Sequence, residues 1–240
     1  MNVTPGRGPL YRQIREWIVA RIVHGDWRPG DILPSEINLA AEFGVSQGTV
    51  RKAVDALVAE NLVIRHQGKG TYVAVHTPHR ELFHFFHVLG RDGAKPQPTT
   101  SQLISCRQRR AEKEDLGCLH LRPNARVVDI FRVRNLRDRP VILERVIVPS
   151  KLFQGLAESG DVPNELYQLF EKTYGVTIHK VVEEISAELA TVETARYLDI
   201  KPGAPILAIE RRAETLGGMP VEFRRSLCDS RDYIYSNEIV

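Results

Sequence analysis

The sequence predicts an α+β protein: a small helical unit that ends in a β-hairpin, followed by a larger domain built on an antiparallel sheet. Three observations lead to this fold class. Two short helical patterns joined by a tight turn precede a hairpin pattern at 62–73. Beyond it, long strand patterns joined by short turns indicate antiparallel hairpins. A stretch of this second part also recurs once further along the chain.

Composition limits the classes of protein to consider. Hydrophobic residues make up 42% and charged residues 26% of the 240 residues, which is typical of a soluble globular protein with two domains. The chain has no run of about 18 apolar residues, and Arg7 and Arg12 interrupt any signal-peptide core. The scattered cysteines Cys106, Cys118 and Cys228 fit neither a disulfide framework nor a zinc motif. We therefore expect a cytoplasmic protein that stays off the membrane and needs no metal or cofactor.

Net charge does not mark a nucleic-acid-binding surface. The total is +3, with 9 Lys and Arg against 7 Asp and Glu in residues 1–75 and 24 against 23 in residues 76–240. A claim for such a surface must therefore rest on local arrangement.

The first residues predict two helices. The stripe of an amphipathic helix over 10–24 is formed by Leu10, Ile14, Trp17, Ile18 and Ile22. Gly25 ends this helix. Ser35 is a good N-cap for a short helix that runs to Phe43 and stops at Gly44.

A third helix follows after a very tight turn. Only Val45 separates Gly44 from Ser46, a second N-cap candidate. The apolar face of this helix is formed by Val50, Ala53, Val54, Leu57 and Val58. Its polar face is formed by Gln47, Gly48, Arg51, Lys52 and Asp55. Two short helices joined in this way are typical of a helix-turn-helix, whose second helix enters the DNA major groove.

The polar face suggests specific contacts. Gln47 and Arg51 lie four residues apart, and Gln can pair with adenine and Arg with guanine. The hydroxyl groups of Ser46 and Thr49 suit phosphate. Lys52 is either a further contact or a solvent-facing group without a role.

The hairpin pattern indicates a wing. After Asn61 the pattern changes to two strands about the turn Gly68-Lys69-Gly70. The glycines let the backbone approach a phosphate or a groove floor, and Lys69 brings charge to the tip. Arg65 is either a phosphate contact or ordinary strand surface.

This part of the chain resembles the GntR family of bacterial regulators. The matching stretches are PLYRQI at 9–14, PGDILPSE at 29–36, LAAEFGVSQGTVRKAVDAL at 39–57 and GKGTYV at 68–73. The resemblance implies a winged helix-turn-helix, a base or phosphate contact for Arg51 and a minor-groove contact for the Gly68–Gly70 turn. Ile37, Gln47 and Gly48 depart from residues common in that family, so we expect a different operator and a shallower salt dependence. The predicted DNA-contacting residues are Ser35, Ser46, Gln47, Gly48, Thr49, Arg51, Lys52, Arg65, Gly68, Lys69 and Gly70.

The remainder predicts a second domain. A segment without periodicity at 76–80 is the predicted linker between a DNA-binding domain at 1–75 and a domain at 81–240. Predicted strands are 82–89, 100–109, 126–136, 140–148, 177–189, 205–215 and 219–228. Predicted helices are 112–118, 151–157, 164–174 and 191–199.

This second domain contains an internal repeat. Residues 119–134 align with 198–213 at an offset of 79. The coinciding pairs are Leu119/Leu198, Leu121/Ile200, Pro123/Pro202, Ala125/Ala204, Ile130/Ile209 and Arg132/Arg211. We predict a sheet with two pseudo-two-fold halves and a ligand cleft between equivalent elements. Chance similarity of two amphipathic hairpins is the alternative.

Residues 81–240 resemble the UTRA effector domain of the HutC-like branch of the same family. The residues that carry this looser resemblance are Leu89, Gly90, Gly93, Pro96, Arg132, Val133, Arg134, Pro140, Val141, Glu144, Val148, Pro149, Tyr174, Gly175, Leu198, Pro220, Val221 and Glu222. The resemblance implies the chorismate-lyase fold and a domain that senses a small metabolite and forms dimers.

Two arginines are the strongest candidates for the effector site. Arg132 and Arg134 are two apart on a predicted strand, so they point to one face. Guanidinium groups placed side by side repel unless an anion or carboxylates neutralise them, and we predict a carboxylate or phosphate of the effector. Glu144 and Glu222 occupy equivalent-looking hairpin positions and either bind effector hydroxyl or amine groups or pair with the arginines. The predicted effector-binding residues are Arg132, Arg134, Glu144, Glu222, Arg224 and Tyr233.

Other sites find less support. Glu165 stands where sugar-phosphate sensors of this type often have a serine, which makes an anion less welcome there. His84 and His87 are three apart, hence on opposite faces of a strand, and no Cys or Asp completes a zinc site. The sequence contains no nucleophile elbow, Walker loop or dinucleotide fingerprint.

These patterns predict a homodimeric transcription regulator, a repressor or else an activator, that binds a palindromic DNA operator and responds to a small anionic metabolite. We expect no enzymatic activity, because no acid–base pair at a recognisable spacing is present. One alternative is a lyase-like enzyme in the second domain, which a turnover assay would reveal. The other is an inert dimerisation module, which a ligand-dependent change in DNA affinity would exclude.

Overall fold

A computed structural model describes residues 8–75, 88–91, 100–136, 138–160 and 162–236. The chain divides into two compact units, Met1–Val75 and His76–Val240, and each is considered by itself. The predicted linker, most of the predicted strand at 82–89 and both His84 and His87 lie outside the described residues.

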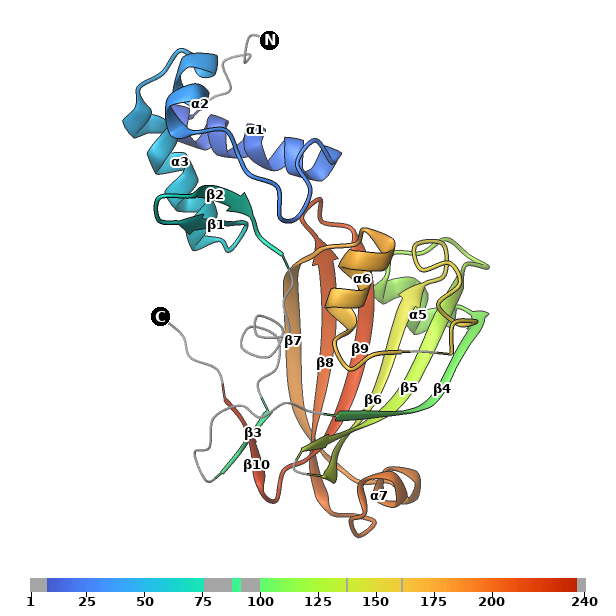
Figure 1. The fold of residues 1–240 in the computed structure, drawn as a ribbon. Coiled ribbons are helices and arrows are strands. Elements are labelled where there is room, and N and C mark those ends of the chain that lie inside the picture. Colours follow the sequence, from blue (N-terminus) through green and yellow to red (C-terminus); the bar gives the residue numbers. More distant parts are fainter. Residues whose placement is uncertain (1–7, 76–87, 92–99, 137, 161, 237–240) are drawn as a thin grey trace. The chain divides into compact units, whose positions relative to one another are not determined.

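In residues 8–75 of the first unit, three helices precede a two-stranded hairpin (Figure 1). Its elements are α1 (Leu10–His24), α2 (Glu36–Phe43), α3 (Gln47–Ala59), β1 (Val63–His66) and β2 (Gly70–Val73). Most of the predicted apolar stripes form its core, with Ile18, Leu39, Val50 and Leu57 almost completely buried, but Leu10 at the start of α1 is exposed. The predicted helices and hairpin are confirmed.

Serine caps begin α2 and α3, and a glycine ends α2. The hydroxyl of Ser35 accepts a hydrogen bond from the amide of Asn38, and that of Ser46 accepts one from the amide of Thr49, both at 3.2 Å. Each bond satisfies a backbone donor that a helix start otherwise leaves unpaired. Gly44 ends α2 with a φ of 64°, a left-handed conformation that glycine adopts without steric cost.

The second unit is built on a six-stranded antiparallel sheet in the order β4-β5-β6-β9-β8-β7. These strands are β4 (Thr100–Arg110), β5 (Arg126–Leu136), β6 (Arg139–Pro149), β7 (Ile178–Leu189), β8 (Pro205–Thr215) and β9 (Pro220–Asp229). The helices in the described part of the unit are α5 (Lys113–Cys118), α6 (Leu166–Tyr174) and α7 (Val192–Leu198). A separate antiparallel pair joins β3 (Val88–Gly90) to β10 (Tyr233–Tyr235), and β10 was not predicted.

The sheet confirms the internal repeat. β5 and β8 begin and end at the same offset of 79 residues. With β4, β5 and β6 equivalent to β7, β8 and β9, both halves of the sheet have the same strand order from the edge to the centre. Arg145 pairs directly with Arg225, which is also its equivalent in the repeat. The pseudo-two-fold axis therefore passes between the central strands β6 and β9.

Strand alternation gives the sheet two apolar faces. On one face Val128 and Ile130 belong to a core that includes Phe170 of α6, and Figure 1 shows α6 lying across the strands. On the other face Val127 packs with Leu119, which follows α5, and Val133 packs with Leu198 of α7.

One predicted helix is wrong. Residues 151–157 form a series of turns rather than a helix. Phe153 and Leu156 are both buried in the core under α6, and their spacing of three imitates a helical stripe. Gly155 between them has a φ of 80°, which a right-handed helix does not accommodate.

Candidate functional site

The polar face of α3 is turned to solvent, as the sequence predicted. Gln47, Gly48, Arg51 and Lys52 are exposed, whereas Val50 and Leu57 on the opposite face are fully buried. The side chain of Arg51 retains 58% of its accessible surface. The start of α3 can therefore enter a groove without rearrangement of the helix.

The hydroxyl groups at the start of α3 already have roles in the fold. Those of Ser46 and Thr49 lie 2.9 Å apart, and Ser46 also caps the helix. Any phosphate contact would share these oxygens with the cap. Ser35 caps α2 in the same way.

The wing has the predicted turn. Gly68 and Gly70 have φ values of 72° and 118°, so both adopt backbone conformations that favour glycine. A Cβ at Gly70 would lie 3.0 Å from the side chain of Ile32, whereas a Cβ at Gly68 would meet no atom within 4 Å. Gly70 thus serves packing inside the unit, and Gly68 and exposed Lys69 form the tip.

Glu36, which is not among the predicted DNA-contacting residues, links two arginines of this surface. Its carboxylate accepts hydrogen bonds from Nε of Arg51 and from Nη2 of Arg65, each at 3.0 Å. Arg65 also forms an ion pair of 2.8 Å with Asp55. Arg65 is therefore ion-paired to α2 and α3 rather than being plain strand surface. The three partners are far apart in sequence, so no spacing pattern connects them.

In the second unit, five of the six predicted effector residues lie together. Arg132, Arg134, Glu144, Glu222 and Arg224 are all buried on the face of the sheet that carries α6. Alternation along β5 places both arginines on this face, as predicted.

Arg132 joins the sheet to the segment that precedes α6. It retains 1% of its accessible surface, and its Nε donates to Oε2 of Glu144 at 2.6 Å. Its Nη1 donates to the carbonyl oxygens of Pro163 and Asn164, both at 3.1 Å. Arg132 thus fixes the position of the chain at the start of the helix.

The carboxylates of the cluster form ion pairs with the arginines. Nη2 of Arg224 donates to Oε2 of Glu222 at 2.7 Å, and Nη1 of Arg224 reaches Oε1 of Glu144 at 3.4 Å. Nη1 of Arg134 lies 4.0 Å from the same oxygen of Glu144. The salt-bridge network that the sequence left open as an alternative is therefore present in this structure.

The charges shift the acid–base properties of the cluster. Burial by itself would raise the pKa of Glu144, but Arg132, Arg224 and Arg134 outweigh it and hold that pKa well below its ordinary value. Burial and the nearby Glu222 carboxylate raise the pKa of Tyr167, whose hydroxyl donates to Glu222 at 3.0 Å. Glu144 is therefore a permanent anion and Tyr167 a permanent hydrogen-bond donor near neutral pH.

Four residues of this cluster were missed, and the repeat carried a signal for one of them. Arg211 is the repeat equivalent of Arg132, is also buried, and donates to Glu183 at 2.8 Å. The hydroxyl of Tyr235 donates to the same glutamate. Tyr167 reaches the cluster from α6. Glu183 comes from β7 at the edge of the sheet and Tyr235 from β10 outside it, so only the folded domain brings them to this place.

Two sequence interpretations of the cluster need correction. Glu144 faces Arg132 in the ladder, whereas Glu222 faces Ala213, so the two glutamates are not equivalent. The repeat equivalent of Glu144 is Arg224. Tyr233 lies in an apolar cluster with Val88 and Val141 rather than among the charged groups.

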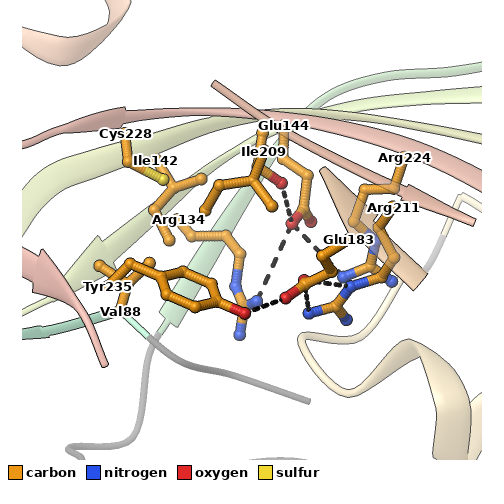
Figure 2. Close-up of a pocket in the computed structure, with 11 residues that line it drawn as sticks. Val88, Arg134, Ile142, Glu144, Glu183, Ile209, Arg211, Arg224, Cys228 and Tyr235 are labelled. Atoms are coloured by element: carbon orange, nitrogen blue, oxygen red, sulfur yellow. Dashed lines mark hydrogen bonds and ion pairs between the residues drawn. The ribbon is translucent and has the colours of Figure 1, made fainter. Parts of the chain in front are cut away.

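A small cavity lies beside the charged cluster (Figure 2). Its volume is about 30 Å³, which is room for about one water molecule. The lining residues are Val88, Arg134, Ile142, Glu144, Glu183, Ile209, Arg211, Arg224, Ser226, Cys228 and Tyr235. Among the described residues the cluster unites four arginines, at 132, 134, 211 and 224, with three glutamates, at 144, 183 and 222.

Both units match known protein families. The bacterial regulatory proteins of the gntR family match residues 10–73, and the UTRA domain matches residues 95–234. The chain belongs to the GntR family. It is a DNA-binding transcription regulator with a UTRA domain, as the sequence predicted, and the predicted α+β fold class is confirmed.

Curated relatives match this GntR-family regulator along most of its length. The mannosyl-D-glycerate transport/metabolism system repressor MngR of Escherichia coli K12 is 31% identical over 231 residues, which cover 96% of each chain. The repressor NagR of Bacillus subtilis is 32% identical over 95% of this chain and 93% of its own. The histidine utilization repressor of Pseudomonas putida is 30% identical over 92% and 88%.

Solved structures support the same fold. The ligand-binding domain of a GntR-family regulator from Bordetella bronchiseptica has a TM-score of 0.62 and 29% identity, and the match covers 66% of this chain and 99% of that domain. PhnF from Mycobacterium smegmatis has a TM-score of 0.57 over 95% of this chain and 99% of its own at 22% identity, which supports the fold alone.

No helix in the described part of the regulator is long and apolar enough to cross a membrane. Within the same residues, no group of three or more His, Cys, Asp or Glu side chains is arranged to hold a metal ion.

Proposed function

We propose that this GntR-family regulator is a cytoplasmic homodimeric repressor that binds a palindromic operator and releases it when a small anionic metabolite occupies the buried arginine–glutamate cluster. The relatives whose names state a function are repressors of utilisation or transport systems. Their named compounds differ, so they support the class of regulator and leave the effector open.

The observation that carries the effector proposal is the gathering of three buried arginines, Arg134, Arg211 and Arg224, around one cavity. Buried arginines need anionic partners, so an anion that enters the cavity can replace the carboxylates that hold them in this structure. Arginine binds carboxylate and phosphate through paired hydrogen bonds. Arg134 and Arg211 line the cavity, and Ser226 and Tyr235 add hydroxyl groups there.

The cavity is too small for a metabolite as it stands, so the effector has to displace existing ion pairs. Arg132 holds both Glu144 and the carbonyl oxygens of Pro163 and Asn164, so an anion that displaces Glu144 from this arginine also disturbs the start of α6. An effector that stabilises one arrangement of this segment over another shifts the equilibrium between regulator states and thereby its affinity for DNA.

The DNA part of the proposal rests on the exposed polar face of α3. We propose contacts from Ser46, Gln47, Gly48, Thr49, Arg51, Lys52, Arg65, Gly68 and Lys69, with Ser35 and Gly70 supporting the turn and the wing. A two-fold dimer would place two such helices about one helical turn of DNA apart.

The test has two steps. A DNA site is first selected from randomised duplexes with the full chain, and anisotropy then measures affinity for that site with sugar acids, sugar phosphates and amino acids added. We expect a palindromic site and at least one anionic compound that weakens binding and raises the melting temperature. Selection of no sequence would overturn the operator proposal. Recovery of the active compound in chemically altered form would favour the lyase-like alternative.

A further inference from the structure

The carboxylate of Glu36 lies at the junction of the three elements that form the DNA-facing surface. Glu36 is the first residue of α2, Arg51 lies on α3, and Arg65 lies on β1 of the wing. One carboxylate oxygen accepts a hydrogen bond from Nε of Arg51, and the other accepts one from Nη2 of Arg65, each at 3.0 Å. Glu36 thus connects the recognition helix to the wing.

A third donor approaches the same group. Nε2 of Gln47 lies 3.4 Å from Oε2 of Glu36, the oxygen that Arg51 also uses. Two of the side chains suited to reading bases, Gln47 and Arg51, therefore share one acceptor. Their conformations are linked to each other through Glu36.

Glu36 binds a different atom of Arg51 from those that would contact a base. Glu36 engages Nε, while the bidentate contact of arginine with guanine can use the two terminal Nη groups. A long arginine side chain on a surface loses considerable rotamer entropy when it is ordered. Holding Nε in the free protein reduces that loss at the moment of DNA binding.

The negative charge of Glu36 lowers the non-specific affinity for DNA. The phosphate backbone attracts Arg51, Lys52, Arg65 and Lys69, and a carboxylate among them repels it. A residue that served only affinity would not be acidic here. The side chain of Glu36 is 19% exposed and its partner Arg51 is 58% exposed, so the ion pair is also a weak contributor to folding stability.

We propose that Glu36 is a positioning residue that determines base specificity by holding Arg51 in the orientation that reads guanine. This inference rests on the proposed binding of an operator through α3. It predicts that loss of Glu36 reduces discrimination between sites more than it reduces affinity for DNA in general.

The experiment compares variants of the full chain by selection from randomised DNA duplexes, followed by anisotropy on the selected site and on a scrambled duplex. The variants are Glu36→Ala, Glu36→Gln, Arg51→Ala and the double variant. Glu42→Gln is the matched control, because Glu42 lies on the same helix and is an exposed glutamate that lies 4.0 Å from Arg21. It removes the same charge without touching Arg51.

We expect Arg51→Ala to abolish a guanine preference in each half-site, and Glu36→Ala to reduce that same preference about tenfold. Affinity for the scrambled duplex should stay constant or rise, and the double variant should match Arg51→Ala alone. Glu36→Gln keeps the size of the side chain and one acceptor oxygen but removes the charge. It provides the same comparison if Glu36→Ala lowers the melting temperature too far for the binding measurement.

The outcomes separate this inference from the proposed function. If the unchanged chain selects no sequence, operator binding itself fails. If it selects a palindrome and a folded Glu36 variant keeps the full guanine preference, Glu36 does not position Arg51. An equal loss for Glu42→Gln would show a general charge effect and would also overturn the inference.

Discussion

Glu144 and Arg224 occupy equivalent positions in the two halves of the UTRA sheet and form an ion pair of 3.4 Å next to the pseudo-two-fold axis. The two halves thus have the same backbone arrangement but carry opposite charges at this position. Replacement of a cation by an anion at one of two equivalent positions turns a point of repulsion into a point of attraction. The same exchange leaves an asymmetric site, which suits a ligand without internal symmetry.

Removal of Glu144 should destabilise the UTRA domain strongly. Glu144→Ala leaves Arg132 and Arg224 buried without their shared carboxylate, and breaking a buried pair in this way costs about 3–5 kcal/mol. Urea unfolding at neutral pH, followed by circular dichroism, measures the free energy of unfolding. The control is Glu184→Gln in the exposed pair with Arg212, for which we expect a loss below about 1 kcal/mol. Equal losses for both variants would show that the cluster is not a stabilising network.

Acid should weaken the folded state through the same residue. The pKa of Glu144 is lowered in the folded protein, so its stabilising contribution is complete above the ordinary value of 4.5. As the pH falls below that value, Glu144 becomes protonated in the unfolded chain but stays ionised in the folded protein, and the free energy of unfolding decreases. Urea unfolding between about pH 6 and pH 3 should therefore show a shallower decline for Glu144→Gln than for the unchanged protein. Parallel declines would contradict the lowered pKa.

Arg134 should be required for the response to effector and not for binding to DNA. It lines the cavity next to Glu144, with its Nη1 4.0 Å from that carboxylate, so it lies where a ligand anion would enter. Arg134→Ala should keep operator affinity and reduce sensitivity to the active compound by about 10-fold or more, since charge-assisted hydrogen bonds contribute roughly 1.5–3 kcal/mol each. Anisotropy titration with and without the compound measures both quantities. Arg212→Ala, on the opposite face of the sheet, serves as the control. An unchanged response would place the effector elsewhere.

The first unit was largely predictable from sequence because its determinants are local. Caps at Ser35 and Ser46, the glycine after α2 and the stripes of apolar residues each act within a few residues of chain. Signals that act over so few residues can be recognised in the amino-acid sequence. Glu36 escaped them because its partners come from two other elements, and only the packed unit places all three together.

The effector cluster was predictable in part for the same reason. Arg132 and Arg134 share a face by alternation, which needs no knowledge of the fold. Glu183 and Tyr235 join them through β7 and β10, whose places follow from sheet order and tertiary contacts. Glu144 and Glu222 look equivalent because both lie on the same face of the sheet soon after a hairpin turn, but Glu222 is two residues short of the position equivalent to Glu144, which is Arg224.

The recognition helix and the wing tip should make different kinds of contribution to DNA binding. Arg51 suits a base edge, whereas Lys69 at the wing tip suits phosphate. Arg51→Ala should weaken binding to the selected site by about 1–3 kcal/mol and leave binding to a scrambled duplex nearly unchanged. Lys69→Ala should weaken both by a similar amount and reduce the slope of log affinity against log salt by about 1. Anisotropy titrations on both duplexes at several salt concentrations distinguish the two residues. If Arg51→Ala bound its selected site normally, α3 would not be the element that reads the bases, and the exposed polar face of this helix would need another explanation.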